Sequence, residues 1–362
     1  MNRLVLIGNG FDLAHGLKTR YEDFIYWYWK QRILNLYEET SNVSDDYLCK
    51  LTTLQNDAWN LFVFNNNNLL HQSEGKDIYK YLVENKELYK VENRYLFERI
   101  HQSIETKGWV DIENDYYELL IRRLMPLKPS SEIDVSFLNL QLEKVRFLLV
   151  TYLKSEQKKE LAVKEDIKEK IYKPITKKEI AVANNTFSKY RLKAYNPPSR
   201  TVLLNFNYTY TPELYMANRS DVTINYIHGR VDNLQSVIFG YGDEMGEFER
   251  LKNLNENECL RHMKSIRYLE SDNYRKMLEF IESAPFQVCI MGHSCGNSDR
   301  TLLNTLFEHK NCVSIKPYYY IKDDKTDNYL ELVQNISRNF TDMKLMRDRV
   351  VNKTYCEPLT KK

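Results

Sequence analysis

Glycine is scarce in this chain, at 11 of 362 residues. The sequence also has no Cys-x-x-Cys pair among its six cysteines, no apolar run as long as a membrane helix, and almost no net charge. Its 52 basic residues nearly cancel its 50 acidic ones, which leaves a formal net charge of +2. These shortages argue against a zinc ribbon, a disulfide framework, a membrane span, and general binding to nucleic acids or membrane surfaces.

The compartment and the size of the protein follow from similar arguments. The opening apolar run is too short for a secretory signal and ends in Gly8 instead of a cleavage site. Scattered cysteines are typical of reduced thiols, so we expect a cytoplasmic protein. A chain of 362 residues exceeds what one compact core usually holds, which predicts two folding units or one domain with a large insertion.

Because glycine is scarce, its clusters are informative. Residues 3–7 form a continuous apolar run that ends at Gly8-Asn9-Gly10, and a helical pattern starts near Tyr21. An apolar run bounded by glycine predicts a strand buried on both faces of a parallel sheet. The first twenty-odd residues therefore predict a strand, a glycine loop and a helix start that together cradle a nucleotide.

The chain then changes character twice. Residues 31–199 hold long amphipathic stretches that predict a helical insertion domain, with helices expected at 47–64, 77–104, 112–125 and 135–154. Residues 154–180 alternate in charge, which favours an exposed helix or connector over a binding tail. After residue 200, strands are expected at 201–204, 222–227, 237–243, 286–291 and 313–321, and helices at 256–283 and 328–350.

This alternation predicts an α/β fold with a parallel sheet and helices on both faces, interrupted by the helical insertion. The nucleotide-binding domain would combine residues 1–30 with 200–362. In such sheets the ligand lies outside the carboxyl ends of the strands. Small or polar residues follow five expected strands or strand segments, after Ile7, Leu204, Ile227, Phe239 and Met291.

Each motif has a structural alternative. Gly8, Gly10 and Gly16 fit a phosphate loop, but also a tight turn. Asn207 could hold a ribose hydroxyl or a water, or serve as a cap. His228 could accept a proton, or be a hydrogen-bonded structural histidine.

The same holds further along the chain. Gly292-His293-Ser294 with Asp299 fits a loop that grips ribose hydroxyls, or a strand-to-helix cap. Trp109, Asp111 and Glu113 lie in the insertion. Their spacing favours a structural role, with Asp111 as a helix cap and Glu113 in the first turn.

Taken together, these motifs resemble the AbiH family of bacteriophage abortive-infection proteins. The resemblance covers nearly the whole chain in order. It rests on residues 4–17, 21–24, 109–113, 205–209, 227–229, 239–242 and 292–294.

A more distant similarity is to sirtuin-type NAD-binding domains. Gly8, Gly10, Gly16 and Leu17 reproduce the spacing of their glycine loop, and Asn207 stands at their asparagine. His228-Gly229 resembles their catalytic H-G, and residues 292–294 resemble their G-T-S loop. The chain departs from them in lacking the zinc module, which argues against protein deacylation, and in carrying Thr209 where an aspartate is usual.

These resemblances imply an NAD glycohydrolase that depletes NAD on infection, with NAD as substrate and no required cofactor or metal. They imply catalytic roles for His228, Asn207 and Asp12. Nucleotide contacts would come from Gly8, Asn9, Gly10, Phe11, Gly16, Gly292, Ser294 and Asp299. A nucleotide sensor without chemistry is the alternative, and a nuclease ranks lower because residues 154–178 are charge-balanced. We expect a homo-oligomer, because defence enzymes must stay silent until triggered; no motif of the chain identifies the phage trigger.

Overall fold

The computed structural model describes residues 1–38, 42–54, 75–107, 111–124, 133–180, 195–216, 219–242, 244 and 246–361. Contacts divide the chain into two compact units. The first contains Met1–Lys18, Leu153–Glu249 and His262–Lys362, and the second contains Thr19–Tyr152 and Arg250–Arg261. The domain boundaries expected from the sequence stay a prediction.

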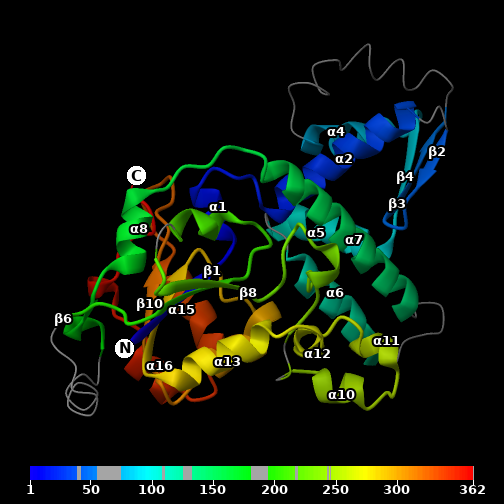
Figure 1. Ribbon diagram of the computed structural model, residues 1–362. Coiled ribbons are helices and arrows are strands. Elements are labelled where there is room, and N and C mark those ends of the chain that lie inside the picture. The colour runs from blue at the N-terminus through cyan, green and yellow to red at the C-terminus, as the bar shows by residue number, and fades with distance from the viewer. Residues whose placement is uncertain are drawn as a thin grey trace. The chain divides into compact units, whose positions relative to one another are not determined.

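A five-stranded parallel sheet forms the centre of the first unit (Figure 1). Across the sheet the order is β10-β9-β1-β7-β8. The strands are β1 (Asn2–Ile7), β7 (Thr201–Asn205), β8 (Val222–Tyr226), β9 (Phe286–Met291) and β10 (Cys312–Tyr318). Counted along the chain this order is 3-2-1-4-5, the order of a Rossmann-type sheet, with its switch point between β1 and β9. The predicted α/β class is confirmed.

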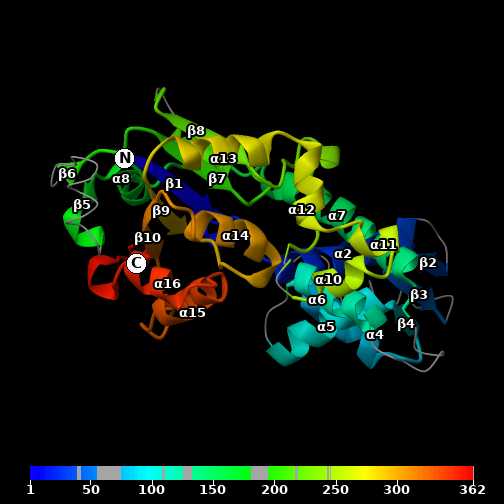
Figure 2. The same cartoon turned by 90° about the horizontal axis from the view of Figure 1, so that it is seen from below.

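Helices cover both faces of this sheet. On one face, Leu4, Leu6 and Val288 pack with the apolar sides of α13 (Asn273–Ser283), α14 (Arg300–Phe307) and α15 (Tyr329–Arg338). Figure 2 shows α13 beside β8 and β7. On the other face, Val5 and Ile7 pack with α1 (Asn9–Ala14) and α8 (Glu165–Tyr172). Every residue of β1 and β9 is buried, which explains why both appear in the sequence as unbroken apolar runs.

Segment 154–180 is less exposed than predicted. Ile167 and Ile171 of α8 are completely buried against the sheet. They lie four residues apart, on one helix face, and this apolar stripe outweighs the charged residues around it.

Three other predictions, for segments after residue 236, are wrong. The expected strand 237–243 contains no strand over 237–242, and Asp243 lies outside the described residues. The backbone there bonds to segments other than strands: Ile238 N–H donates to His228 O and Tyr241 N–H to His262 O. Expected helix 256–283 is broken into α11 (Asn257–Leu260), α12 (Lys264–Arg267), the 3₁₀ turn η6 (Tyr268–Glu270) and α13.

Expected helix 328–350 is likewise two helices, α15 and α16 (Met343–Arg349). Asp342 starts the second one, because its carboxylate accepts the N–H of Lys344 and Leu345. Shorter elements of the first unit are β5 (Ile175–Thr176), β6 (Tyr195–Asn196), η3 (Lys177–Glu179), η4 (Thr211–Tyr215), η5 (Leu234–Ser236), η7 (Asn297–Asp299) and η8 (Lys353–Tyr355).

The second unit is helical but also contains an antiparallel sheet of β2 (Val43–Asp45), β3 (Cys49–Thr53) and β4 (Tyr89–Asn93). The predictions of helix at 47–54 and at 89–93 are therefore wrong, and residues 55–64 lie outside the described residues. In β3, Cys49 and Leu51 are buried while Lys50 and Thr52 are not. This alternation is the pattern of a strand, but five residues are too few for it to stand out from the helical patterns on either side.

The remaining helices are α2 (Tyr21–Glu38), α4 (Gly75–Glu84), α5 (Tyr95–Lys107), α6 (Ile112–Ile121), η1 (Arg122–Leu124), α7 (Val135–Glu156) and α10 (Phe248–Lys252). Asp111 caps α6 by accepting the N–H of Asn114 at 3.1 Å, and Glu113 lies in its first turn. The structural interpretation of these two residues is confirmed, whereas Trp109 lies outside the described residues. In the part of the chain that the structure describes, no helix has both the length and the apolarity to cross a membrane.

Candidate functional site

The loops that follow β1 and β9 touch at the switch point of the sheet. Gly8 N–H donates to Met291 O at 3.3 Å, and Gly10 N–H donates to Gly292 O at 2.8 Å. Gly292 has φ +78, and a Cβ there would lie 2.1 Å from the backbone nitrogen of Phe11. The two loops therefore approach so closely that a side chain at Gly292 cannot be accommodated. In this conformation the amides of Gly8 and Gly10 bond to protein carbonyls, as the tight-turn alternative requires.

Gly16, the third glycine of the motif, ends helix α1. Its N–H donates to Leu13 O, Leu17 N–H donates to Asp12 O, and its φ is +84. A left-handed glycine after the last turn is a common way to terminate a helix. This local geometry accounts for Gly16 without a ligand.

Asp12 lies in α1 with only 1% of its surface exposed. Its Oδ2 accepts a hydrogen bond from Thr209 Oγ1 at 2.6 Å, and its Oδ1 is buried without a hydrogen-bond partner among the described residues. Burial raises the pKa of this carboxyl to about 6, against the opposing effect of nearby polar groups, Thr209 first. Asp12 thus places a carboxylate directly beside Thr209.

Asn207 joins the loop after β7 to the glycine loop. Its Nδ2 donates to Gly8 O at 3.0 Å, and its N–H donates to Asn205 Oδ1 at 3.2 Å. Asn205, which is fully buried, donates in turn to Thr209 O. These bonds hold segment 205–209 against the loop of β1, so Asn207 and Asp12 belong to one connected network.

His228 follows β8 and is 3% exposed. Its Nε2 lies 3.1 Å from the hydroxyl of Tyr268 and 3.3 Å from Asp299 Oδ1. The ring of Phe206 packs edge-on between two imidazoles, with centroids 5.3 Å from His228 and 4.1 Å from His293. Burial, and then the charge of Lys264, lower the pKa of His228. The environment of His228 is thus buried but polar.

Asp299 is the centre of the second part of the site. Lys264 Nζ lies 2.8 Å from its Oδ1, and His293 Nε2 lies 3.5 Å from its Oδ2. Although burial acts to raise the pKa of Asp299, the charge of Lys264 and the contact with His228 hold it well below its usual value. Asp299 is the N-cap residue of α14 but makes no side-chain cap bond, so its carboxylate serves the cluster and not the helix.

The Phe239-Gly240-Tyr241-Gly242 block positions this cluster. A Cβ on Gly240 would lie 1.9 Å from His262 O, and Lys264 N–H donates to Tyr241 O at 2.9 Å. Gly242 O accepts from Thr301 N–H, next to Asp299. The block therefore ties Lys264 and the 298–301 segment to one another.

Sequence reasoning missed two residues of this cluster, Lys264 and Tyr268. Neither stands in a motif, and both fall within a stretch expected to be one continuous helix. The one sequence feature that points to them is the pair of glycines at 240 and 242, to which we assign no role from the sequence alone.

The structure brings together most residues singled out from the sequence. Gly8, Asp12 and Asn207 form one network, and His228, His293 and Asp299 form another. The two are linked through Phe206, by the close approach of Gly8 to His293, and by the bond from Gly10 to Gly292. Ser294 is exposed at the surface, and its carbonyl accepts from Asn335. Asp111 and Glu113 belong to the second unit. No group of His, Cys, Asp or Glu in the described residues is arranged to hold a metal ion.

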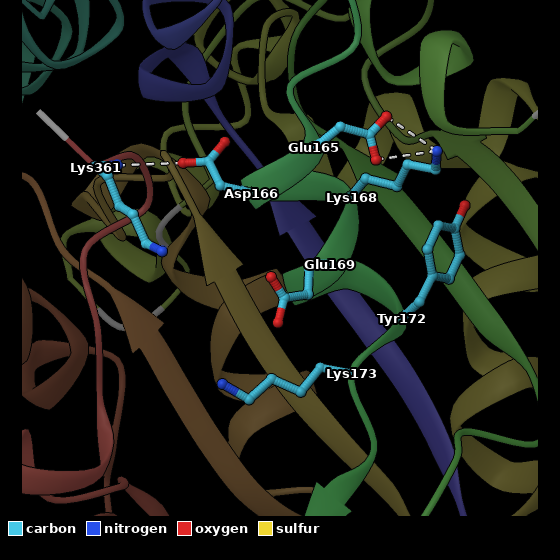
Figure 3. Close-up of a pocket in the computed structure, with 7 residues that line it drawn as sticks. All are labelled: Glu165, Asp166, Lys168, Glu169, Tyr172, Lys173 and Lys361. Atoms are coloured by element: carbon cyan, nitrogen blue, oxygen red, sulfur yellow. Dashed lines mark hydrogen bonds and ion pairs between the residues drawn. The ribbon is translucent and has the colours of Figure 1, made fainter.

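A separate groove of about 690 Å³ lies on α8 and contains none of these residues (Figure 3). Its lining balances three carboxylates against three lysines: Lys168 pairs with Glu165, and Asp166 also accepts the backbone N–H of Lys361. An internally neutralised surface offers no excess charge to a phosphate, so this groove is a poor nucleotide site.

Comparison with known proteins gave one informative result. The family model described as bacteriophage abortive infection AbiH matches residues 4–320. Neither the curated proteins nor the solved structures contain a match.

Proposed function

The chain belongs to the bacteriophage abortive infection AbiH family, and we propose that its part in that defence is to hydrolyse the nicotinamide–ribose bond of NAD. The observation that carries this proposal is the meeting of Asp12, Asn207, His228 and Asp299 at the carboxyl ends of β1, β7, β8 and β9. Dinucleotides bind at this edge of Rossmann-type sheets, beside the switch point.

The chemistry needs a charge stabiliser and a base. Cleavage of this bond passes through a ribosyl cation, so a nearby carboxylate lowers the barrier. The buried Asp12 Oδ1, which has no partner among the described residues, is suited to that role. His228 takes a proton from water, the hydroxyl oxygen bonds to C1′ of the ribose, and nicotinamide leaves with the electron pair of the broken bond. Asn207 orients the water.

Binding of NAD at the glycine loop requires a change in its hydrogen bonds. For the amides of Gly8 and Gly10 to bind a pyrophosphate, they must leave the carbonyls of Met291 and Gly292. The proposal therefore includes a separation of these two loops when NAD binds. A protein whose site is closed at rest suits a defence enzyme that must stay silent before infection.

The test measures nicotinamide release from NAD by the purified protein, alone and with lysate of phage-infected cells. We expect release by the wild type in at least one condition, and a loss of at least about 10²-fold in His228→Ala, because removal of a general base costs on this order. Asn207→Ala should also lower the release, because it removes the group that orients the water. Lys276→Ala, an exposed change on α13, is the control and should behave as wild type. Release that continues unchanged in both site variants contradicts the assignment.

One observation favours a second function, a nucleotide sensor without chemistry. His228 is buried, and its Nε2 already contacts Asp299 and Tyr268. NAD or ADP-ribose that binds with calorimetric heat, is not turned over in either condition, and changes the oligomeric state would establish the sensor and exclude the hydrolase.

A further inference from the structure

The contacts of Asp299 bear on which ring nitrogen of His228 carries its hydrogen. Lys264 is 0% exposed, and its ammonium group lies 2.8 Å from Asp299 Oδ1. A buried ammonium group is stable only beside a compensating charge. Asp299 is therefore ionised, and an ionised carboxylate only accepts hydrogen bonds.

The same oxygen of Asp299 faces Nε2 of His228 at 3.3 Å. Two acceptors do not bond to each other, whereas the hydroxyl of Tyr268, 3.1 Å from Nε2, accepts as readily as it donates. A hydrogen on Nε2 therefore suits both neighbours, and a hydrogen on Nδ1 would suit only Tyr268. His293 is fixed by the same carboxylate: its Nδ1 accepts the N–H of Cys295 at 2.9 Å, which leaves its hydrogen on Nε2, 3.5 Å from Asp299 Oδ2.

We propose that Lys264 and Asp299 are positioning residues that hold His228 as its Nε2–H tautomer, so that Nδ1 is the atom that accepts the proton in the hydrolysis. This inference rests on the proposed function. Nδ1 makes no hydrogen bond to the described residues, so its lone pair is available to a water. When Nδ1 takes the proton of water, the imidazolium formed lies against Asp299, which stabilises it. The proton returns to solvent when the site reopens.

The charged and titratable groups that face His228 determine how substitutions change its pKa. They are Lys264 from α12, Tyr268 from η6, Asp299 from η7, His293 from the loop after β9, and the more distant ring of Tyr208. Lys264 lowers the pKa of His228 and Asp299 raises it. Lys264→Met should therefore raise this pKa, and Asp299→Asn should lower it.

The first measurement is the tautomer of His228 by nitrogen NMR on histidine-labelled protein without NAD, with His228→Gln used to assign its signals. We expect the hydrogen on Nε2 in the wild type and a mixture of tautomers in Asp299→Asn. A hydrogen on Nδ1 in the wild type overturns the inference. Because no NAD is present, this result is independent of whether the protein hydrolyses it.

The second measurement is the pH dependence of nicotinamide release. Its acidic limb should move to higher pH in Lys264→Met and to lower pH in Asp299→Asn. The matched control is Lys316→Met, because Lys316 pairs with Glu179 at 2.9 Å with similar burial, on β10 and away from the site. Lys316→Met should destabilise the fold but leave the pH profile unmoved. An acidic limb that moves equally in the control, or in neither site variant, overturns the positioning role.

Either single variant leaves one buried charge unpaired and can unfold the protein. The double variant Lys264→Met/Asp299→Asn removes both charges, so we expect it to keep the fold. In it the tautomer preference of His228 should be lost, together with at least about 10²-fold of activity. A double variant that keeps the Nε2–H tautomer and wild-type release also overturns the inference.

Discussion

Two buried aspartates of the first unit have opposite environments, although both lie near the end of a central strand. Asp299 faces Lys264 and two histidines, which hold its pKa well below the usual value. Asp12 has hydroxyl and amide groups near it but no cation in the contacts described, and burial raises its pKa to about 6. Asp299 is therefore a fixed negative charge, whereas Asp12 gains or loses its charge near physiological pH.

The Asp12→Asn variant tests this environment through protein stability. Because the folded-state pKa of Asp12 is raised above its value of 3.8 in the unfolded chain, its contribution to the free energy of unfolding falls as pH rises from about 4 to about 6. Relative to wild type, Asp12→Asn should gain on the order of 3 kcal/mol in total, most of it within that window and the rest as the pH rises above about 6. Urea unfolding of both proteins at several pH values measures the difference.

Asp324→Asn is the matched control. Asp324 is exposed, and its hydrogen bonds from Thr326 lower its pKa, so any effect of this variant should be small and of opposite sign. An Asp12→Asn difference that does not change with pH would contradict the described environment of Asp12.

At the scale of elements, the contact between the loops after β1 and β9 depends on glycine for two separate reasons. Gly292 needs a positive φ and also needs the space that a Cβ would take from Phe11. Gly16 has a similar φ of +84 but no atom within 4 Å of its would-be Cβ. A substitution at Gly16 therefore tests backbone strain alone, whereas one at Gly292 tests backbone strain together with a steric clash.

Gly16→Ala should cost about 1–2 kcal/mol of unfolding free energy, the cost of a left-handed conformation alone. Gly292→Ala should cost clearly more, because the loop containing Phe11 must also move. Thermal and urea unfolding of the two variants measures the difference. Equal costs would show that the two loops are not in contact in solution.

The strands of the central sheet are well predicted from the sequence, because a buried parallel strand is an apolar run that ends at glycine or asparagine. The predicted bounds of β9, 286–291, are those observed, and those of β1 and β7 agree within a residue. Segment 237–242 has the same composition but no strand, because its backbone bonds to 228 and 262–264. That pairing joins distant residues, and no local pattern encodes it.

The main residues of the candidate site are predictable from the sequence, but their partners are not. Asp12, Asn207, His228 and Asp299 each follow a strand of the sheet, so the strand ends alone indicate that they meet. Their partners cannot be foreseen. The pairing of Asp299 with Lys264 depends on a break between α11 and α12, and that break depends on the close approach of Gly240 to His262.

At the scale of the whole molecule, a Rossmann-type sheet and a second unit of helices with a small antiparallel sheet are encoded in one chain of the AbiH family. The second unit is inserted mainly between β1 and β7, directly after the glycine loop. In this conformation the proposed NAD site is closed by the contact of Gly10 with Gly292 and by the burial of His228. Abortive infection needs an effector that is harmless until triggered, and the proposed closed site fits that need.

A crystal structure of the protein with a non-hydrolysable NAD analogue tests the central claim most directly. The account predicts the analogue at the carboxyl ends of β1 and β9, its pyrophosphate against residues 8–10 and its nicotinamide ribose beside Asn207 and His228. An analogue bound elsewhere, such as in the groove on α8, or a protein that takes up none of it would contradict the account.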